Sequence, residues 1–267
     1  MMPELPEVET VRRGLEGGII GKRVLDVVIN NSKVIREPSA LEFKKGVIGQ
    51  VPREVIRKGK VLIIKFKEDN FLVIHLRIAG WLLYGDEAEK ARVVFRFSKG
   101  KCLNYMDQRL LGELKLRKDY RDLKFIKELG PEPFDLSLAE FKKIVQAKKT
   151  KIKVLLMDQK IISGIGNIYA QEALFLSKIL PFRPADCLNN KEVKFLHQKM
   201  ISVLNTAIKY KGSSVDIYRN IQGEKGGMEK RLKVYGRKGR PCPRCKKPVE
   251  KMILGGRGTC FCPHCQK

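Results

Sequence analysis

The chain has 267 residues, of which 43% are hydrophobic, which is enough for one large or two modest domains with their own cores. Lysine and arginine number 55 against 29 aspartate and glutamate, so the formal net charge is +26. Because these basic residues are spread along the chain, we expect nucleic acid as the partner, with general solubility or an anionic membrane surface as the alternative. The sequence has no apolar run long enough to span a membrane and no secretory signal. Membrane-spanning and secreted proteins are therefore excluded, and a cytoplasmic protein is expected.

The first 105 residues predict one helix followed by many short strands. Residues 7–20 carry apolar side chains at helical spacing, which predicts an amphipathic helix. Short β-rich runs follow, several of them separated by turn signals such as 68–70 and 98–100. We expect strands at 24–29, 61–66, 71–76, 81–84, 93–97 and 101–105. This pattern indicates an antiparallel sandwich or barrel.

A domain boundary is expected at residues 129–133, because this segment breaks regular structure and the hydrophobic period changes from two to about 3.6 beyond it. Helices are predicted at 138–147, 152–157, 167–176 and 191–210. The glycine-rich segment 212–229 predicts a flexible loop. We therefore expect an α+β protein with a β domain at 1–130, a helical domain at 135–230 and a C-terminal finger at 234–267.

Four cysteines near the C-terminus have the spacing of zinc ligands. Cys242 and Cys245 form one C-x-x-C pair, Cys262 and Cys265 form another, and 16 residues lie between the pairs. His264 is the competing ligand, but four cysteines already complete a tetrahedral site. We expect one structural zinc ion with no open position for catalysis. The other three cysteines are expected to be packing residues: Cys102, Cys187 and Cys260.

The ends of the chain offer two further features. The finger is rich in basic residues, and glycines at 255, 256 and 258 would place Arg257 at a hairpin tip that reaches DNA phosphates; a solvated turn is the alternative. At the other end, the acidic residues of the segment 3–7 would suit the dipole of the following helix in an ordinary N-terminal extension.

Several motifs, taken together, predict a specific protein family. They are PELPEVE at 3–9, the segment around Lys60, GIGNIYA at 164–170, VYGRKG at 234–239 and the four-cysteine finger. With these motifs the chain resembles, over essentially its whole length, the formamidopyrimidine-DNA glycosylases of base-excision repair. The resemblance implies an N-terminal antiparallel β-sandwich lobe, a C-terminal lobe with a helix-two-turn-helix element and a zinc-finger hairpin, and damaged double-stranded DNA bound between the lobes.

The resemblance also implies a bifunctional reaction. The nitrogen of Pro3 attacks C1′ of the damaged nucleotide and expels the base, and the resulting iminium promotes elimination of both flanking phosphates. Glu4 matches the carboxylate that handles protons at the sugar, and Lys60 matches the lysine that contacts the phosphate beside the lesion and assists catalysis. Arg257 matches the finger arginine, which contacts backbone phosphates and is counted with the catalytic residues. The residues matched to substrate or DNA binding are Glu7, Lys153, Asn167, Tyr235 and Arg237.

Two departures from the family pattern affect these expectations. The family fills the gap left by the flipped base with methionine, arginine and phenylalanine, and the matching residues here are Ile78, Arg109 and Leu111. Arg109 retains the arginine that reads the opposite cytosine, whereas Ile78 and Leu111 are aliphatic. Selectivity for the opposite base should therefore be better preserved than stacking on the neighbouring bases. In addition, Met1 and Met2 precede Pro3, although initiator-methionine removal needs a small second residue. We expect Met2 to be the true start, or Met1 to be an addition.

The expected substrates are oxidised purines, chiefly 8-oxoguanine opposite cytosine and formamidopyrimidines. The loop at 213–229 supports this choice, because the family uses it to enclose the flipped base. The alternatives are an endonuclease VIII-like enzyme for oxidised pyrimidines, a non-catalytic zinc-finger protein that binds undamaged DNA, and an RNA-binding ribbon protein. We expect a monomeric bacterial protein that associates with the nucleoid through DNA.

Overall fold

A computed structural model describes residues 2–67, 69–215 and 218–267. Met1, Glu68 of the expected 68–70 turn, and residues 216–217 of the expected 213–229 loop therefore lie outside the described residues. The chain divides into two compact units, Met1–Lys127 with Ile208–Glu229, and Glu128–Ala207 with Lys230–Lys267. None of the described helices combines the length and apolar character that a membrane crossing requires.

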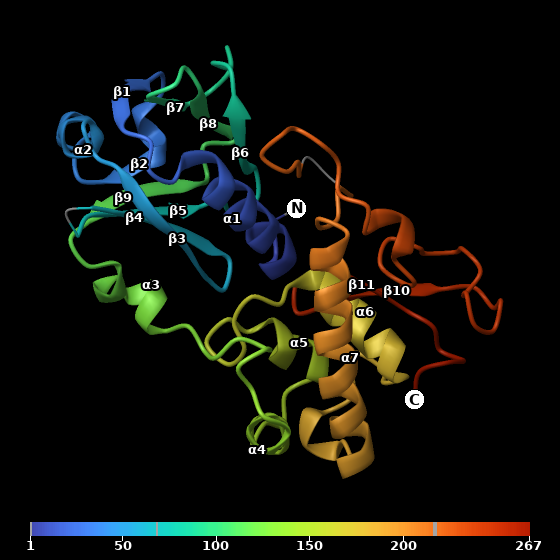
Figure 1. Ribbon diagram of the computed structural model, residues 1–267. Coiled ribbons are helices and arrows are strands. Elements are labelled where there is room, and N and C mark those ends of the chain that lie inside the picture. The colour runs from blue at the N-terminus through green and yellow to red at the C-terminus, as the bar shows by residue number, and fades with distance from the viewer. Residues whose placement is uncertain (1, 68, 216–217) are drawn as a thin grey trace. The chain divides into compact units, whose positions relative to one another are not determined.

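Two β-sheets form the framework of the first unit (Figure 1). One sheet has the order β1 (Val24–Ile29), β7 (Val93–Phe97), β8 (Cys102–Asp107) and β6 (Gly80–Gly85). The other has the order β2 (Ile35–Glu37), β9 (Glu113–Arg117), β5 (Phe71–His75), β4 (Val61–Phe66) and β3 (Pro52–Lys58). Neighbouring strands are antiparallel except β2 and β9, which are parallel. The predicted antiparallel sandwich is confirmed.

One hydrophobic core joins side chains of both sheets with helices α1 (Leu5–Ile19) and α2 (Ala40–Val47). Helix α1 supplies its apolar residues at helical spacing to this core, among them Val8, Val11 and Leu15. The short segments η2 (Tyr120–Asp122) and α3 (Lys124–Lys127) pack on a second cluster formed by β4 and β5. A further 3-10 turn is η1 (Ser32–Val34).

Residues 208–229 complete the first unit, although the sequence-based boundaries place them in the helical domain. Tyr218 and Ile221 belong to its hydrophobic core. The backbone N–H of Tyr84 donates to the carbonyl of Ile221 across 2.7 Å. These tertiary contacts, which no local sequence pattern reveals, determine where the segment packs.

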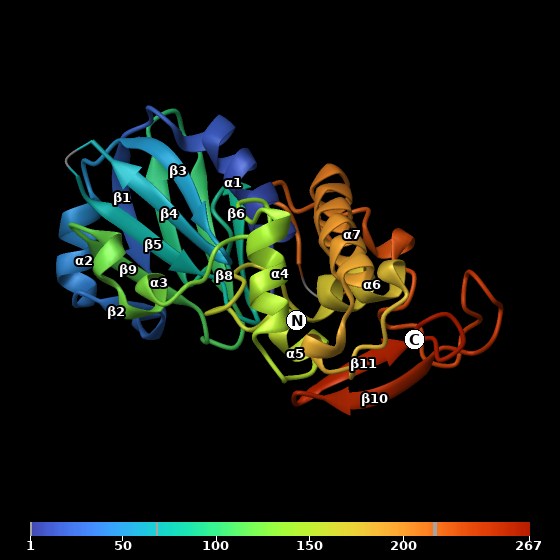
Figure 2. The same ribbon diagram turned by 90° about the horizontal axis from the view of Figure 1, so that it is seen from below.

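Helices and a C-terminal hairpin make up the second unit (Figure 2). The helices are α4 (Leu138–Gln146), α5 (Ile152–Met157), α6 (Asn167–Ser177) and α7 (Asn190–Lys209), whose last two residues fall in the first unit. The hairpin strands are β10 (Glu250–Leu254) and β11 (Arg257–Phe261). The 3-10 turns are η3 (Ala185–Cys187) and η4 (Glu229–Arg231), whose first residue falls in the first unit. Helix α6 is buried on nearly all sides, so it is the central helix on which the other elements of this unit pack.

Two of the three cysteines expected to be packing residues are buried. Cys102 belongs to a hydrophobic cluster with Val94 and Met106, and Cys260 lies in the cluster around the finger. The packing prediction for Cys187 is wrong, because this residue is exposed at the end of η3. Cys187 is therefore a convenient residue for a control substitution.

Candidate functional site

The N-terminal segment is held in place by the side chain of Glu7. Pro3 is buried and precedes α1, and the carboxylate of Glu7 accepts a hydrogen bond from the backbone N–H of Glu4 at 2.9 Å. The second oxygen of the same carboxylate accepts from the N–H of Ser213 at 2.8 Å, and the hydroxyl of Tyr218 donates to the Glu7 carbonyl. One buried carboxylate thus fixes the residues beside Pro3 to the segment 208–229.

Three connections of the sandwich bring the remaining predicted site residues of this unit to one end of the strands. Lys60 lies in the tight turn between β3 and β4 and is nearly buried. Next to this turn, Val61 pairs with His75 at the end of β5, and His75 pairs with Glu113 at the start of β9. The β3–β4 turn, the β5–β6 connection and the β8–β9 connection therefore adjoin the same end of this sheet.

Ile78 lies in the β5–β6 connection and is half-buried. The residue before it, Arg77, has a left-handed backbone with φ of 51°. Its N–H donates to Nδ1 of His75 and its guanidinium pairs with Glu113 at 2.6 Å. Burial lowers the pKa of His75 to about 3, and the charges of Arg77 and Lys60 act in the same direction. His75 is therefore a neutral acceptor at physiological pH, a feature that sequence reasoning missed.

The β8–β9 connection, residues 108–112, carries Arg109 and Leu111, both exposed. Buried Asp107 holds this connection from both sides, because one carboxylate oxygen accepts from the N–H of Arg109 at 3.0 Å and the other from the N–H of Gly112 at 2.7 Å. Sequence reasoning missed Asp107, although an aspartate directly before a polar turn is a recognised signal for such hydrogen bonds. Asp107 thus fixes the connection from which Arg109 and Leu111 project.

Gly112 has no room for a side chain. A Cβ there would overlap the hydroxyl of Tyr105, a fully buried core residue, and would approach the Asp107 carboxylate. We expect Gly112→Ala to lower the free energy of unfolding by about 1–3 kcal/mol, because buried groups must shift. Urea denaturation measures this loss. The matched control is Gly17→Ala at an exposed position of helix α1, where nothing lies within 4 Å of an added Cβ, and it should stabilise by about 0.5–1 kcal/mol. Equal effects of the two substitutions would contradict the packing argument.

Glu9 forms the charged centre between α1 and β3. It pairs with Arg12, Arg13 and Arg57 at 2.8–3.1 Å. Burial alone would raise the pKa of Glu9, but hydrogen bonds from the three guanidinium groups outweigh it and lower the pKa to about 2. This network joins the helix that follows Pro3 to the strand that precedes Lys60.

The Glu9 network predicts a pH-dependent contribution to stability. The folded-state pKa lies below the ordinary value of 4.5, so the contribution is complete above pH 4.5 and is lost as the pH falls towards 2. Urea denaturation of the native protein and of Glu9→Gln between pH 2 and 7 measures it. We expect the difference in unfolding free energy to be largest near neutral pH and to shrink below pH 4.5. A difference that is constant across this range would refute the assignment.

In the second unit, the predicted DNA-binding residues meet beside strand β11. Arg257 is exposed at the start of this strand, after the turn formed by Gly255 and Gly256. Lys153 of α5 is fully buried, and its ammonium donates to the hydroxyl of Thr259 at 2.7 Å. The side-chain amide of Asn167, the first residue of α6, donates to the carbonyl of Gly258 at 3.2 Å.

Tyr235 and Arg237, in the segment that leads to the finger, are half-buried. The Arg237 guanidinium donates to the carbonyl of Pro241. The segment is fixed by the buried carboxylate of Glu172 on α6, which accepts from the N–H groups of residues 233, 234 and 235 at 2.9–3.1 Å. Burial raises the pKa of Glu172, and these three N–H groups oppose that shift.

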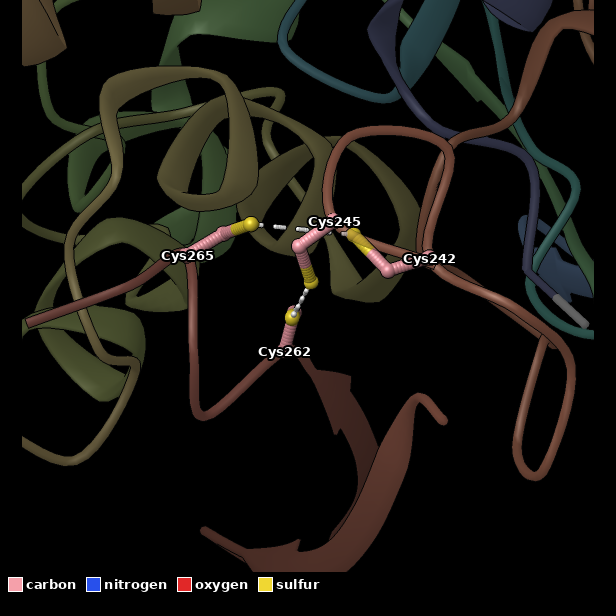
Figure 3. Close-up of side chains that lie close together, drawn as sticks. All are labelled: Cys242, Cys245, Cys262 and Cys265. Carbon is pink, nitrogen blue, oxygen red and sulfur yellow. Dashed lines mark hydrogen bonds between the residues drawn. The ribbon is translucent and has the colours of Figure 1, made fainter. Parts of the chain in front are cut away.

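The four predicted zinc ligands form one cluster (Figure 3). The sulfurs of Cys242 and Cys265 are 3.8 Å apart, those of Cys245 and Cys262 are 3.5 Å apart, and all four lie within 4.8 Å of one another. A tetrahedral zinc ion with Zn–S distances of about 2.3 Å requires sulfur separations of about 3.8 Å. The residues therefore fit one structural zinc ion with four thiolate ligands, and His264 does not belong to the cluster.

Three domain models match this chain in order. Residues 2–114 match the formamidopyrimidine-DNA glycosylase N-terminal domain, 129–219 match its H2TH domain, and 239–267 match the zinc finger found in FPG and IleRS. The chain belongs to the formamidopyrimidine-DNA glycosylase family. The formamidopyrimidine-DNA glycosylase of Geobacillus kaustophilus is 42% identical, with 100% of each chain covered.

Solved structures of this family agree. A mutant Lactococcus lactis FPG in complex with Fapy-dG containing DNA has a TM-score of 0.91 at 34% identity, with 99% of this chain and 100% of that chain covered. The Lactococcus lactis Fpg with abasic-site DNA has a TM-score of 0.91 at 33% identity, with 99% of each chain covered. The predicted family, fold class and zinc finger are confirmed. The roles assigned to individual glycosylase residues stay predictions.

Proposed function

We propose that the protein is a DNA glycosylase and lyase that excises oxidised purines, chiefly 8-oxoguanine opposite cytosine and formamidopyrimidines. The observation that carries this proposal is the match along 99% of the chain to an FPG bound to Fapy-dG containing DNA. The net charge of +26 suits a DNA partner, because neutralised phosphates release counterions. In this proposal the loop at 213–229 encloses the flipped base, which is supported by the hydrogen bond from the N–H of Ser213 to the Glu7 carboxylate beside Pro3.

Pro3 is the proposed nucleophile. An α-amino group has a pKa of about 8 against about 10.4 for lysine, so far more of it is unprotonated at neutral pH. The proline nitrogen bonds to C1′, the glycosidic bond breaks, and the base leaves with the electron pair and gains a proton. Opening of the sugar ring then gives an iminium, because a secondary amine retains the positive charge. This electron sink acidifies the C2′ protons, and the 3′ and then the 5′ phosphate leave.

The remaining roles follow the family pattern. Glu4 handles protons at the sugar, Lys60 binds the phosphate flanking the lesion and assists catalysis, and Arg257 binds backbone phosphates beside the reacting nucleotide. Ile78, Arg109 and Leu111 occupy the gap left by the base, with Arg109 reading the opposite cytosine. Glu7, Lys153, Asn167, Tyr235 and Arg237 complete the substrate-binding set. Buried Lys153 and half-buried Asn167 also bond to the finger strand, which supports a shared role in presenting it.

We further propose three functional parts, a catalytic β domain at 1–130, a helical DNA-binding domain at 135–230 and a finger at 234–267. The proposed form is a monomer in the bacterial cytoplasm that associates with the nucleoid through DNA. Analytical ultracentrifugation at micromolar concentration tests the monomer directly, because a dimer would double the sedimenting mass.

End-labelled duplexes test the proposed activity, with protein that begins at Pro3. We expect an 8-oxoguanine:cytosine duplex to be cut so that both new ends carry phosphate, and an 8-oxoguanine:adenine duplex to be cut much more slowly. A duplex with an oxidised pyrimidine is the comparison. Cleavage of that duplex alone would replace this proposal with the endonuclease VIII-like alternative. Binding without cleavage of either duplex would favour a non-catalytic protein.

A further inference from the structure

Gln171 of α6 joins the helical core to the finger strand. This side chain is buried, its carbonyl oxygen accepts from the N–H of Cys260 at 2.6 Å, and its amide nitrogen donates to the carbonyl of Gly258 at 3.2 Å. Residues two apart on a strand present their backbone groups to the same edge. One glutamine amide, with both a donor and an acceptor, therefore pairs with this edge of β11 as a neighbouring strand would.

Neighbouring side chains reinforce this contact. The Gly258 carbonyl also accepts from the amide of Asn167, and the Gln171 amide nitrogen contacts the carbonyl of Asn167 at 2.7 Å. Thr259 lies between Gly258 and Cys260. Its hydroxyl accepts a hydrogen bond from Lys153 and donates one to the carbonyl of Arg257 at 3.0 Å. The backbone on the C-terminal side of Arg257 is thus fixed by side chains of α5 and α6.

The zinc site does not replace this anchor. Cys262 lies five residues beyond Arg257, which is about 17 Å along an extended strand. A two-stranded hairpin is marginally stable by itself, so its far end needs another support. Zinc fixes the base of the hairpin, whereas Gln171 fixes the part next to Arg257.

We propose that Gln171 is a positioning residue that determines where Arg257 meets the DNA phosphates. This inference rests on the phosphate-binding role proposed for Arg257. Gln171 itself contacts no DNA in this proposal and acts through the backbone of Gly258 and Cys260. Its loss should therefore remove the contribution of Arg257 while the four cysteines keep their zinc.

A double-mutant cycle on the full-length zinc-loaded protein tests the proposal. Gln171→Met keeps the side-chain volume and removes both hydrogen bonds to β11, together with those from the Gln171 amide to Asn167. It is combined with Arg257→Ala. The readout is affinity for a duplex containing a tetrahydrofuran abasic analogue at several salt concentrations. We expect each single variant to bind about tenfold more weakly and to reduce the salt slope by about one. The double variant should bind no more weakly than Arg257→Ala alone.

The controls separate the possible results. Gln146→Met changes an exposed glutamine of α4 and should alter neither affinity nor salt slope. An unchanged salt slope in Arg257→Ala would remove the proposed role of Arg257. A normal effect of Arg257→Ala with additive losses in the double variant would overturn the inference about Gln171. If Gln171→Met loses zinc, Gln171→Glu takes its place in the cycle. Glutamate keeps the acceptor for the N–H of Cys260 and loses the donor to the carbonyl of Gly258. Its loss of DNA affinity should also be non-additive with that of Arg257→Ala.

Discussion

Protein that begins at Pro3 is expected to form a covalent adduct with an 8-oxoguanine:cytosine duplex when borohydride is added, and protein that retains Met1 and Met2 is not. In the printed sequence Pro3 is joined to Met2 by a peptide bond, and an amide nitrogen is neither basic nor nucleophilic. Borohydride reduces an iminium to a stable amine, so only the attacking form is trapped. The expected effect is a loss of trapping to background.

Binding of both forms to a tetrahydrofuran duplex is the control for this comparison. Comparable affinity of the two forms would show that the added methionines leave the DNA-binding surface intact. Pro3→Gly at a free terminus should still be trapped, because glycine keeps an α-amino group. The imine from this primary amine can lose a proton and become neutral, whereas the iminium from proline cannot. An equally strong adduct from the form that retains both methionines would refute Pro3 as the nucleophile and would direct attention to a lysine.

Removal of zinc is the second large effect that we expect. A structural zinc site of this type contributes apparent free energies of about 10–16 kcal/mol, which is as large as the whole stability of a typical domain, about 5–15 kcal/mol. Cys262→Ser should therefore unfold the finger and lower affinity for duplex DNA by at least about 100-fold, because Arg257 and the basic residues around it lose their fixed positions. Measured zinc content should fall from one ion per chain to nearly none.

The exposed Cys187 provides the matched control for this substitution. Cys187→Ser removes a thiol of the same unit without touching the cluster, so zinc content and affinity should stay unchanged. The first unit has its own hydrophobic core, and its amide protons should remain protected in the zinc-free variant. Full DNA affinity without zinc would show that the finger does not contribute to binding.

Strongly patterned elements could be predicted from the sequence. The bounds of β1, β4, β7 and α5 agree with the predicted ranges, because each is a short apolar run flanked by clear breaks. Strands β3 and β9 were not predicted, since both are interrupted by charged residues whose pairing with neighbouring strands decides their conformation. Helix α2 was missed as well, although Ser39 and Glu42 form a capping box at its start.

The candidate site was predicted unevenly for a related reason. Cysteine spacing specifies the zinc cluster directly, and the family motifs identify Pro3, Lys60 and Arg257. The residues that hold these groups depend on contacts between distant parts of the chain. Glu7 and Ser213 are 206 positions apart, and Gln171 and Cys260 are 89 positions apart. No local pattern in a single sequence specifies such pairs.

The first unit is assembled from two separate stretches of chain, and this has a consequence for synthesis on the ribosome. Tyr218 and Ile221 are part of its core, yet helices α4 to α7 are translated before them. The hydrogen bond from Ser213 to Glu7 cannot form until four fifths of the chain exists. The N-terminal sandwich therefore departs from the usual N-to-C order of domain folding, and a nascent chain halted after Lys127 would expose an incomplete core to chaperones and proteases.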